Sequence, residues 1–216
     1  ADDAMTFQQS SFQYYNEIPD NVRYFIAYDP ALPPSGRTKL KRVDKSAIVV
    51  LATDSSQNWY IVKIVANRDT PAKNRELIYN LAAKYNPYVV WMETIAAQRA
   101  MYLEIKSEMR MKGIKFPFRE IPSHSGGKEA RIEQLEPLYE SGRIFHNRDD
   151  KLTTDLEREL LLFGRTPHDD ISDALSFFLN KVSYPTKRRS VSARRDTDSF
   201  YNSYNKQSNV DSWKII

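Results

Sequence analysis

The stretch RTPHDDISDALSFFLNKV, residues 165–182, combines an apolar helical face with three aspartates near its beginning. Asp170 borders the apolar face and Asp173 lies one turn further along. Capping explains one or two acidic residues at a helix N-terminus, but two carboxylates three residues apart repel each other. We therefore expect either simple caps or a positively charged partner opposite them. The apolar face has the i, i+3, i+4, i+7 spacing of a core-facing helix and consists of Ile171, Ala174, Leu175, Phe178, Leu179 and Val182.

Size and composition predict one globular domain with appendages. The chain has 216 residues, 41% of them hydrophobic, which suffices for one buried core. It has no cysteine, which excludes a disulfide scaffold and a thiolate zinc site and favours a cytosolic setting. No run approaches the roughly 18 apolar residues of a membrane span, and the opening ADDAMTFQQS lacks the order of a signal peptide. We expect a protein that is neither secreted nor membrane-bound.

The positive charge is concentrated at the C-terminal end. Residues 184–216 contain seven Lys and Arg against three Asp, which accounts for the whole net charge of +4. This segment is rich in Ser, Asn and Arg and has no apolar period, so we interpret it as a flexible basic tail. Such a tail either contacts nucleic acid or keeps the protein soluble.

The remaining pattern alternates strands and helices. Residues 1–20 form a lead-in that is expected to pack a few aromatic side chains but shows no obvious element. Three strands with short or basic connections predict a meander, and the later strands are linked through helices, which predicts a mixed sheet with helices on both faces. The expected strands are 22–29, 44–53, 58–66, 88–94 and 114–121, and the expected helical segments are 70–87, 96–112, 125–142, 155–163 and 168–182.

Two further carboxylates end apolar strands. Asp29 follows the first strand and Glu93 ends the fourth. If these strands are parallel neighbours, the two side chains meet at the carboxyl edge of the sheet, where sites form in α/β proteins. The last helix can bring Asp170 and Asp173 to the same point, and divalent cations with hard oxygen ligands are the simplest compensation. Taken singly, Asp29 is explained equally well as a turn residue before a proline as it is as a metal ligand. The same holds for Glu93 as the partner of a helix cap.

Three segments together resemble a known family. The segments are YFIAYDPA (24–31), VVWMET (89–94) and HDDISDALSFF (168–178). In their order and separation, they resemble the nuclease domain of the large terminase subunit of tailed bacteriophages, a member of the RNase H-like superfamily. GGKEARIEQLEPLYESGRIFH (126–146) resembles the Lys-x-x-Arg-Ile helix that this family places before its final strand. The resemblance runs from Val22 to Val182. The D-x-x-D-A pattern of the last segment also resembles RuvC-like junction resolvases.

The resemblance implies an α/β fold, an RNase H-like mixed central sheet with a three-strand meander, parallel strands and helices on both faces. It places this domain at residues 21–183, between the lead-in 1–20 and the tail 184–216. Two Mg²⁺ or Mn²⁺ ions about 4 Å apart are implied. In the family pattern, the first two metal ligands match Asp29 and Glu93, and we expect Asp29 to bridge the ions. The remaining ligands come from the group Asp169, Asp170 and Asp173. Within that group, the helical wheel favours Asp170 with Asp173. The catalytic set is thus Asp29, Glu93, Asp170 and Asp173.

The implied function is a metal-dependent DNA endonuclease that cuts concatemeric double-stranded DNA for viral packaging, with little sequence specificity. The implied partners are an ATPase motor domain, a small terminase subunit and a portal, in the cytoplasm of an infected bacterium. The chain has no G-x-x-x-x-G-K-[ST] phosphate loop, so we expect an excised nuclease domain or a stand-alone relative that needs no ATP to cleave. A junction resolvase and a catalytically silent DNA-binding module are the alternatives.

Basic side chains near the acidic positions are candidates for DNA contacts. One set lies in the loop after the first strand, and the other begins the helix after the Gly-Gly turn; both either neutralise phosphates or are simply solvated. The candidates are Arg37, Lys39, Lys41, Arg42, Lys128 and Arg131. The three histidines, His124, His146 and His168, are too scattered for a zinc site.

Overall fold

The structure is a computed structural model that describes residues 5–31, 45–122, 127–166 and 169–186. Arg37, Lys39, Lys41 and Arg42, together with tail residues 187–216, lie outside the described residues. The described elements are η1 (Gln9–Ser11), β1 (Gln13–Tyr15), β2 (Arg23–Asp29), β3 (Ser46–Thr53), β4 (Trp59–Asn67), α1 (Pro71–Tyr85), β5 (Val89–Thr94), α2 (Ala96–Met111), β6 (Phe118–Pro122), α3 (Lys128–Glu133), α4 (Glu136–Glu140), β7 (Ile144–Asn147), α5 (Thr153–Leu161) and α6 (Asp170–Ser176).

One mixed sheet organises these elements, with strand order β1-β7-β4-β3-β2-β5-β6. β2, β3 and β4 form an antiparallel meander, whereas β5 is parallel to β2 and β6 is parallel to β5. On the other side of the meander, β7 is parallel to β4 and β1 is parallel to β7. The fold class expected from the sequence is confirmed.

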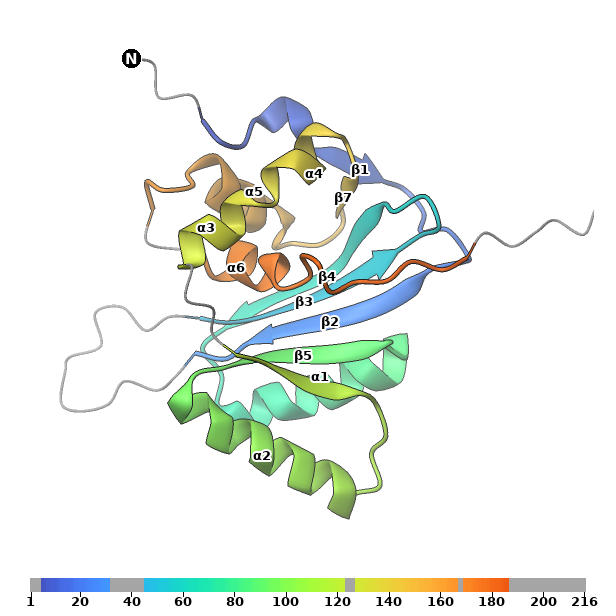
Figure 1. The fold of residues 1–216 in the computed structure, drawn as a ribbon, viewed down its shortest axis with the longest axis vertical. Helices are drawn as coiled ribbons and strands as arrows, with labels where there is room; N and C mark the ends of the chain where they lie inside the picture. The colour runs from blue at the N-terminus through green and yellow to red at the C-terminus, as the bar shows by residue number, and fades with distance from the viewer. Residues whose placement is uncertain (1–4, 32–44, 123–126, 167–168, 187–216) are drawn as a thin grey trace, which may run out of the picture. The chain divides into compact units, whose positions relative to one another are not determined.

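Helices cover both faces of the sheet, and each covered face has its own core (Figure 1). On one side, Ile78 of α1 and Ile105 of α2 pack against alternate residues of β2, β3 and β5. On the other side, α6 lies over β2, β3 and β4, and Phe178 just beyond it joins the same core. All eight residues of β3 are buried, because this strand is covered from both sides.

Local signals explain several element boundaries. Thr70 accepts a hydrogen bond from the Lys73 amide at 3.4 Å and Pro71 takes the first helical position, as expected for α1. The expected single helix over 125–142 is wrong in its continuity: α3 and α4 are separate. Pro137 offers no amide hydrogen and its ring would clash with the carbonyl of residue 133, so one continuous helix cannot pass through it.

The N-terminal lead-in and the end of the last helix also differ from expectation. Residues 1–20 were expected to pack a few aromatic side chains without a regular element. Phe7 and Phe12 are indeed buried against Tyr139, but β1 extends the sheet. The last helix ends at Ser176 rather than at residue 182, and the following residues continue as turns with i to i+3 hydrogen bonds. Apolar periodicity identified the buried face but not this change in winding. Within the described part of the chain, no helix is both long and apolar enough to span a bilayer.

Candidate metal centre

Three carboxylates from three elements converge at one edge of the sheet. β2 and β5 are parallel with Tyr28 beside Met92. The next residues, Asp29 and Glu93, therefore lie at the same level, where Asp29 is the last residue of β2 and Glu93 the last but one of β5. α6 crosses over β2 and supplies Asp173. One oxygen from each of Asp29, Glu93 and Asp173 lies within 4.8 Å of the others. The structure thus brings together three of the residues singled out in the sequence.

The convergence leaves an electrostatic imbalance. Burial raises the pKa of Asp29 to about 8, and the charges of Asp173 and Glu93 add to the shift. Burial also raises the pKa of Glu93, although the Arg131 guanidinium opposes this shift. A carboxyl group that holds its proton near neutral pH indicates that cations from the protein do not fully compensate the cluster.

A lysine on α3 supplies part of the compensation. The Lys128 Nζ atom lies 2.7 Å from Asp169 and 3.5 Å from Asp173. Asp170 is 3.9 Å from the same atom. Burial alone would lower the pKa of Lys128, but Asp173 and Asp169 beside it raise the pKa well above its ordinary value. This lysine is the positive partner that the spacing of the aspartates in α6 led us to expect.

An arginine one turn further along α3 joins two of the three carboxylates. Arg131 Nη2 lies 2.5 Å from Asp173, and Arg131 Nη1 lies 3.4 Å from Glu93. The guanidinium also stacks over the Phe177 ring, 4.9 Å from its centroid. Arg131 and Lys128 were candidates for DNA contacts, and in this structure both side chains contact carboxylates.

None of the three aspartates serves as the helix cap that the simplest interpretation required. Asp169 occupies the N-cap position of α6 without a side-chain cap hydrogen bond, and Asp170 accepts the Lys45 backbone amide at 3.3 Å. The cap is instead Glu159 of α5, whose Oε2 atom accepts hydrogen bonds from the backbone amides of Ile171 at 3.0 Å and Ser172 at 2.8 Å.

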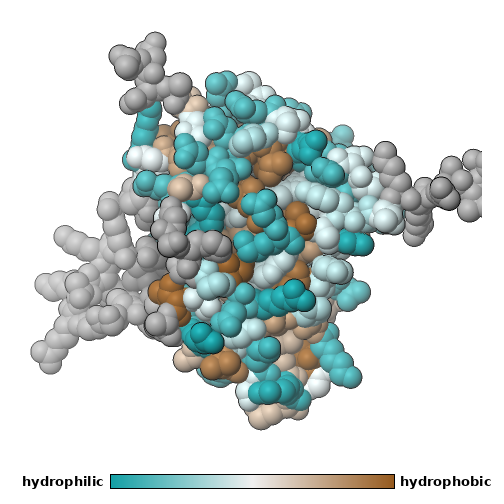
Figure 2. Space-filling view, viewed as in Figure 1, coloured by the Kyte–Doolittle hydropathy of each residue, from teal (hydrophilic) through white to brown (hydrophobic). Residues whose placement is uncertain are grey.

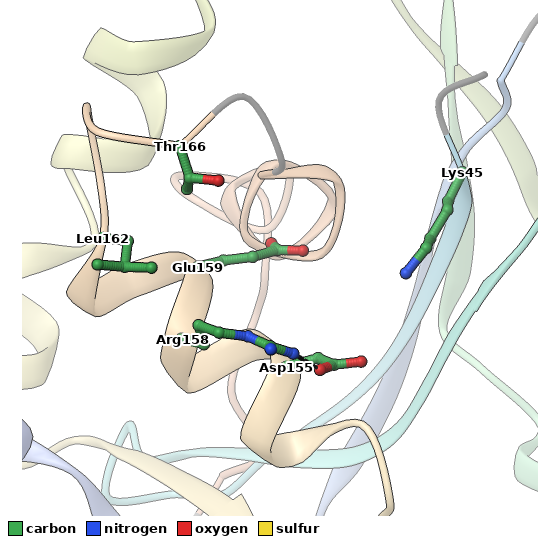
Figure 3. A pocket seen from close by; sticks show the side chains of 6 residues that line it. All are labelled: Lys45, Asp155, Arg158, Glu159, Leu162 and Thr166. Atoms are coloured by element: carbon green, nitrogen blue, oxygen red, sulfur yellow. Dashed lines mark hydrogen bonds and ion pairs between the residues drawn. The ribbon is translucent and has the colours of Figure 1, made fainter. Parts of the chain in front are cut away.

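Glu159 was not identified from the sequence, because its role depends on how α5 packs against α6. Burial raises its pKa to about 7. Its side chain extends from α5 into a cleft of about 310 Å³ that Lys45 borders from the opposite side (Figure 3). By holding the first turn of α6, Glu159 fixes the direction in which Asp170 and Asp173 project.

Histidine takes no part in this centre among the described residues. The buried His146 of β7 contacts the Tyr139 hydroxyl at 2.9 Å through Nε2 and the Glu157 carboxylate at 2.8 Å through Nδ1. These bonds tie β7 to α4 and α5. His124 and His168 lie outside the described residues. In the described ranges, Asp29, Glu93 and Asp173 form the single acidic, histidine or cysteine group with metal-binding spacing.

We expect the metal-free protein to lose stability as the pH rises from about 4 to about 8. The folded state keeps a proton on Asp29 up to about pH 8, whereas the unfolded chain releases it near the ordinary pKa of 3.8. The free energy of unfolding then falls across this window, by on the order of a few kcal/mol. Thermal melts in EDTA at pH 5 and pH 8 measure the effect. The variant Asp29→Asn should show a smaller fall, and an equal fall in both proteins would contradict the assignment.

A family model described as the terminase RNaseH-like domain matches residues 26–182. No curated protein sequence matches the chain significantly.

Solved structures share the fold. The human cytomegalovirus terminase nuclease domain superposes with a TM-score of 0.55 at 12% identity, over 81% of this chain and 95% of that one. The nuclease domain of the large terminase subunit gp2 of bacterial virus Sf6 gives 0.52 at 9% identity, over 74% and 89%. The large terminase nuclease of thermophilic phage G20c, with bound zinc, gives 0.51 at 23% identity, over 80% and 86%. Because the family model spans most of the chain, the protein belongs to the terminase RNase H-like domain family.

Proposed function

We propose that the chain is a divalent-metal-dependent endonuclease that hydrolyses double-stranded DNA during viral genome packaging. The observation that carries the proposal is the convergence of Asp29, Glu93 and Asp173 within 4.8 Å at the carboxyl edge of two parallel strands. Family membership supplies the biological setting. An ATPase motor, a small terminase subunit and a portal ring are the partners that this setting suggests.

The residues present fit a divalent cation. Asp29, Glu93 and Asp173 offer the hard oxygen ligands that Mg²⁺ and Mn²⁺ prefer. Burial first, and then the charges of Asp173 and Glu93, raise the pKa of Asp29, and a bound cation would oppose both effects. When bound, divalent cations would supply Lewis-acid activation of a water and neutralisation of charge at the scissile phosphate. Among related structures, the cytomegalovirus domain was soaked with manganese and an Sf6 variant was solved with calcium.

Asp170 and Asp169 are the proposed additional ligands for a second ion. Both border the three-carboxylate group, and both face the Lys128 ammonium. Lys128 holds these carboxylates close together while the centre holds no cation. Its ammonium would have to move away for a second cation to use the same oxygens, which would leave it available to a DNA phosphate.

Arg131 positions two of the proposed ligands. It holds Glu93 and Asp173 together through separate guanidinium nitrogens, and its contact with Phe177 restricts its own movement. No group of described side chains at the site forms a base-reading set, so we propose that cleavage has little sequence preference.

Digestion of a supercoiled plasmid tests the proposal. The full chain should nick and linearise DNA with Mn²⁺ or Mg²⁺ and without ATP, and EDTA should stop the reaction. A four-way junction of matched length, added in parallel, separates a packaging-type nuclease from a junction-selective one. Intact plasmid with every cation, or cleavage confined to the junction, would refute the proposed activity.

A further inference from the structure

A second cleft opens on the sheet face that carries Glu93, toward the amino end of β5. It encloses about 510 Å³, and its lining includes Tyr88, Trp91, Arg119 and Lys181. α6 lies over β2, β3 and β4, and β5 and β6 continue the sheet beyond it (Figure 1). The cleft thus occupies a part of this face that α6 leaves uncovered.

The strand register connects this cleft to the metal centre. Side chains alternate along β5, so Trp91 projects from the same face as Glu93, two residues or about 7 Å away. Arg119 of β6 pairs with Trp91 across the sheet and shares that face. Tyr88 directly precedes β5, five residues or about 17 Å from Glu93.

Two basic side chains line this cleft without acidic partners among the described residues. Neither Arg119 nor Lys181 forms an ion pair with a carboxylate in the part of the chain that the structure describes. Lys181 is half-buried, and burial followed by the charge of Arg131 lowers its pKa. An anion that approaches a half-buried ammonium would offset both the cost of its burial and the repulsion from Arg131.

An exposed aromatic ring marks the far end of the same cleft. Tyr88 is 59% exposed, and the Arg23 guanidinium lies 5.3 Å from its ring centroid. Trp91 is held rigidly, because its ring stacks on Phe25 with centroids 5.6 Å apart and planes inclined by 8°. Figure 2 shows hydrophilic and apolar side chains intermixed over β5 and β6 on this side of the molecule, rather than one continuous apolar patch.

We propose that this cleft binds an unpaired DNA strand that leads away from the metal centre. Arg119 and Lys181 contact its phosphates, and Tyr88 stacks against a base. Basic grooves with exposed aromatic rings bind single strands in this way, because every base offers a face for stacking. The chain's own tail is a poor occupant, since residues 187–216 carry seven basic and three acidic side chains. The inference rests on the proposed nuclease function.

Binding measured in EDTA tests the cleft separately from cleavage. Fluorescence anisotropy of the full chain with a labelled ten-nucleotide single strand gives the affinity as a function of salt. The double variant Arg119→Gln, Lys181→Gln should weaken binding about tenfold at low salt and reduce the log-log salt slope by about 1.4, because two phosphate contacts are lost. The variant Tyr88→Ala should weaken binding about tenfold, and Tyr88→Phe should restore it.

The control is Arg110→Gln on α2, which packs against the opposite face of the sheet. It should bind the single strand as the unmodified chain does. Unchanged single-strand affinity in the cleft variants would overturn the inference even if the plasmid is cut. An equal loss for a blunt duplex of the same length would also overturn it, because the cleft would then bind duplex phosphates. Selective loss for the single strand supports the cleft whether or not cleavage is observed.

Discussion

Replacing Asp29 with asparagine is expected to abolish DNA cleavage while making the metal-free protein more stable at pH 8. The change keeps the size of the side chain and removes one charge from the group with Glu93 and Asp173. Since burial and these neighbours raise the pKa of Asp29 to about 8, a neutral amide relieves repulsion that the carboxylate experiences. The rate should fall by three orders of magnitude or more, which corresponds to about 4 kcal/mol of transition-state stabilisation.

Initial rates of plasmid nicking and thermal melts in EDTA measure the two effects in one preparation. Glu120→Gln is the matched control, because Glu120 lies on β6 but its carboxylate faces Thr94 and Arg99. It should cut DNA at nearly the normal rate. Substantial cleavage by Asp29→Asn would remove Asp29 from the proposed ligand set.

Replacing Asp173 with asparagine should abolish cleavage equally but destabilise the metal-free protein. Asp173 is buried and lies 2.5 Å from Arg131 and 3.5 Å from Lys128. Loss of its charge leaves two cations poorly compensated, a change that costs on the order of 3 kcal/mol at buried sites. The Asp29 and Asp173 variants should thus agree in activity and differ in the sign of their change in melting temperature.

The other two aspartates of this segment distinguish ligand from ion-pair partner. Asp170→Asn should strongly reduce cleavage if Asp170 is a ligand, whereas Asp169→Asn should be milder because Asp169 pairs with Lys128 at the edge of the group. Isothermal titration with Mn²⁺ adds a readout that is independent of DNA. If Asp169→Asn proves inactive and Asp170→Asn cleaves normally, Asp169 is the ligand and Asp170 is not.

Much of the centre was predictable because its residues lie beside clear apolar patterns in the sequence. Asp29 and Glu93 each lie at the carboxyl end of an apolar strand, and the acidic residues of α6 border an apolar stripe. These patterns fix which face or edge a side chain occupies. A helix pattern does not say what its polar face meets, so the inward direction of Lys128 and Arg131 emerged only from the packing of α3 against α6.

The features missed were those that depend on distant partners. β1 and β7 are three and four residues long, and neither has a clear apolar alternation. They pair with each other across more than 130 residues of chain, with Gln13 beside Phe145. Glu159 likewise looks like an ordinary polar residue of an amphipathic helix until α6 is placed on it.

The order of Asp29, Glu93 and Asp173 along the chain affects events during synthesis. A ribosome that adds 5–20 residues per second needs roughly 4–16 s to pass from residue 93 to residue 173. Throughout that interval the nascent chain contains only two of the three carboxylates. Lys128 and Arg131 are made before the third carboxylate, so its compensating cations are already present when it emerges. A truncated translation product that stops before α6 would thus be unable to complete the acidic group.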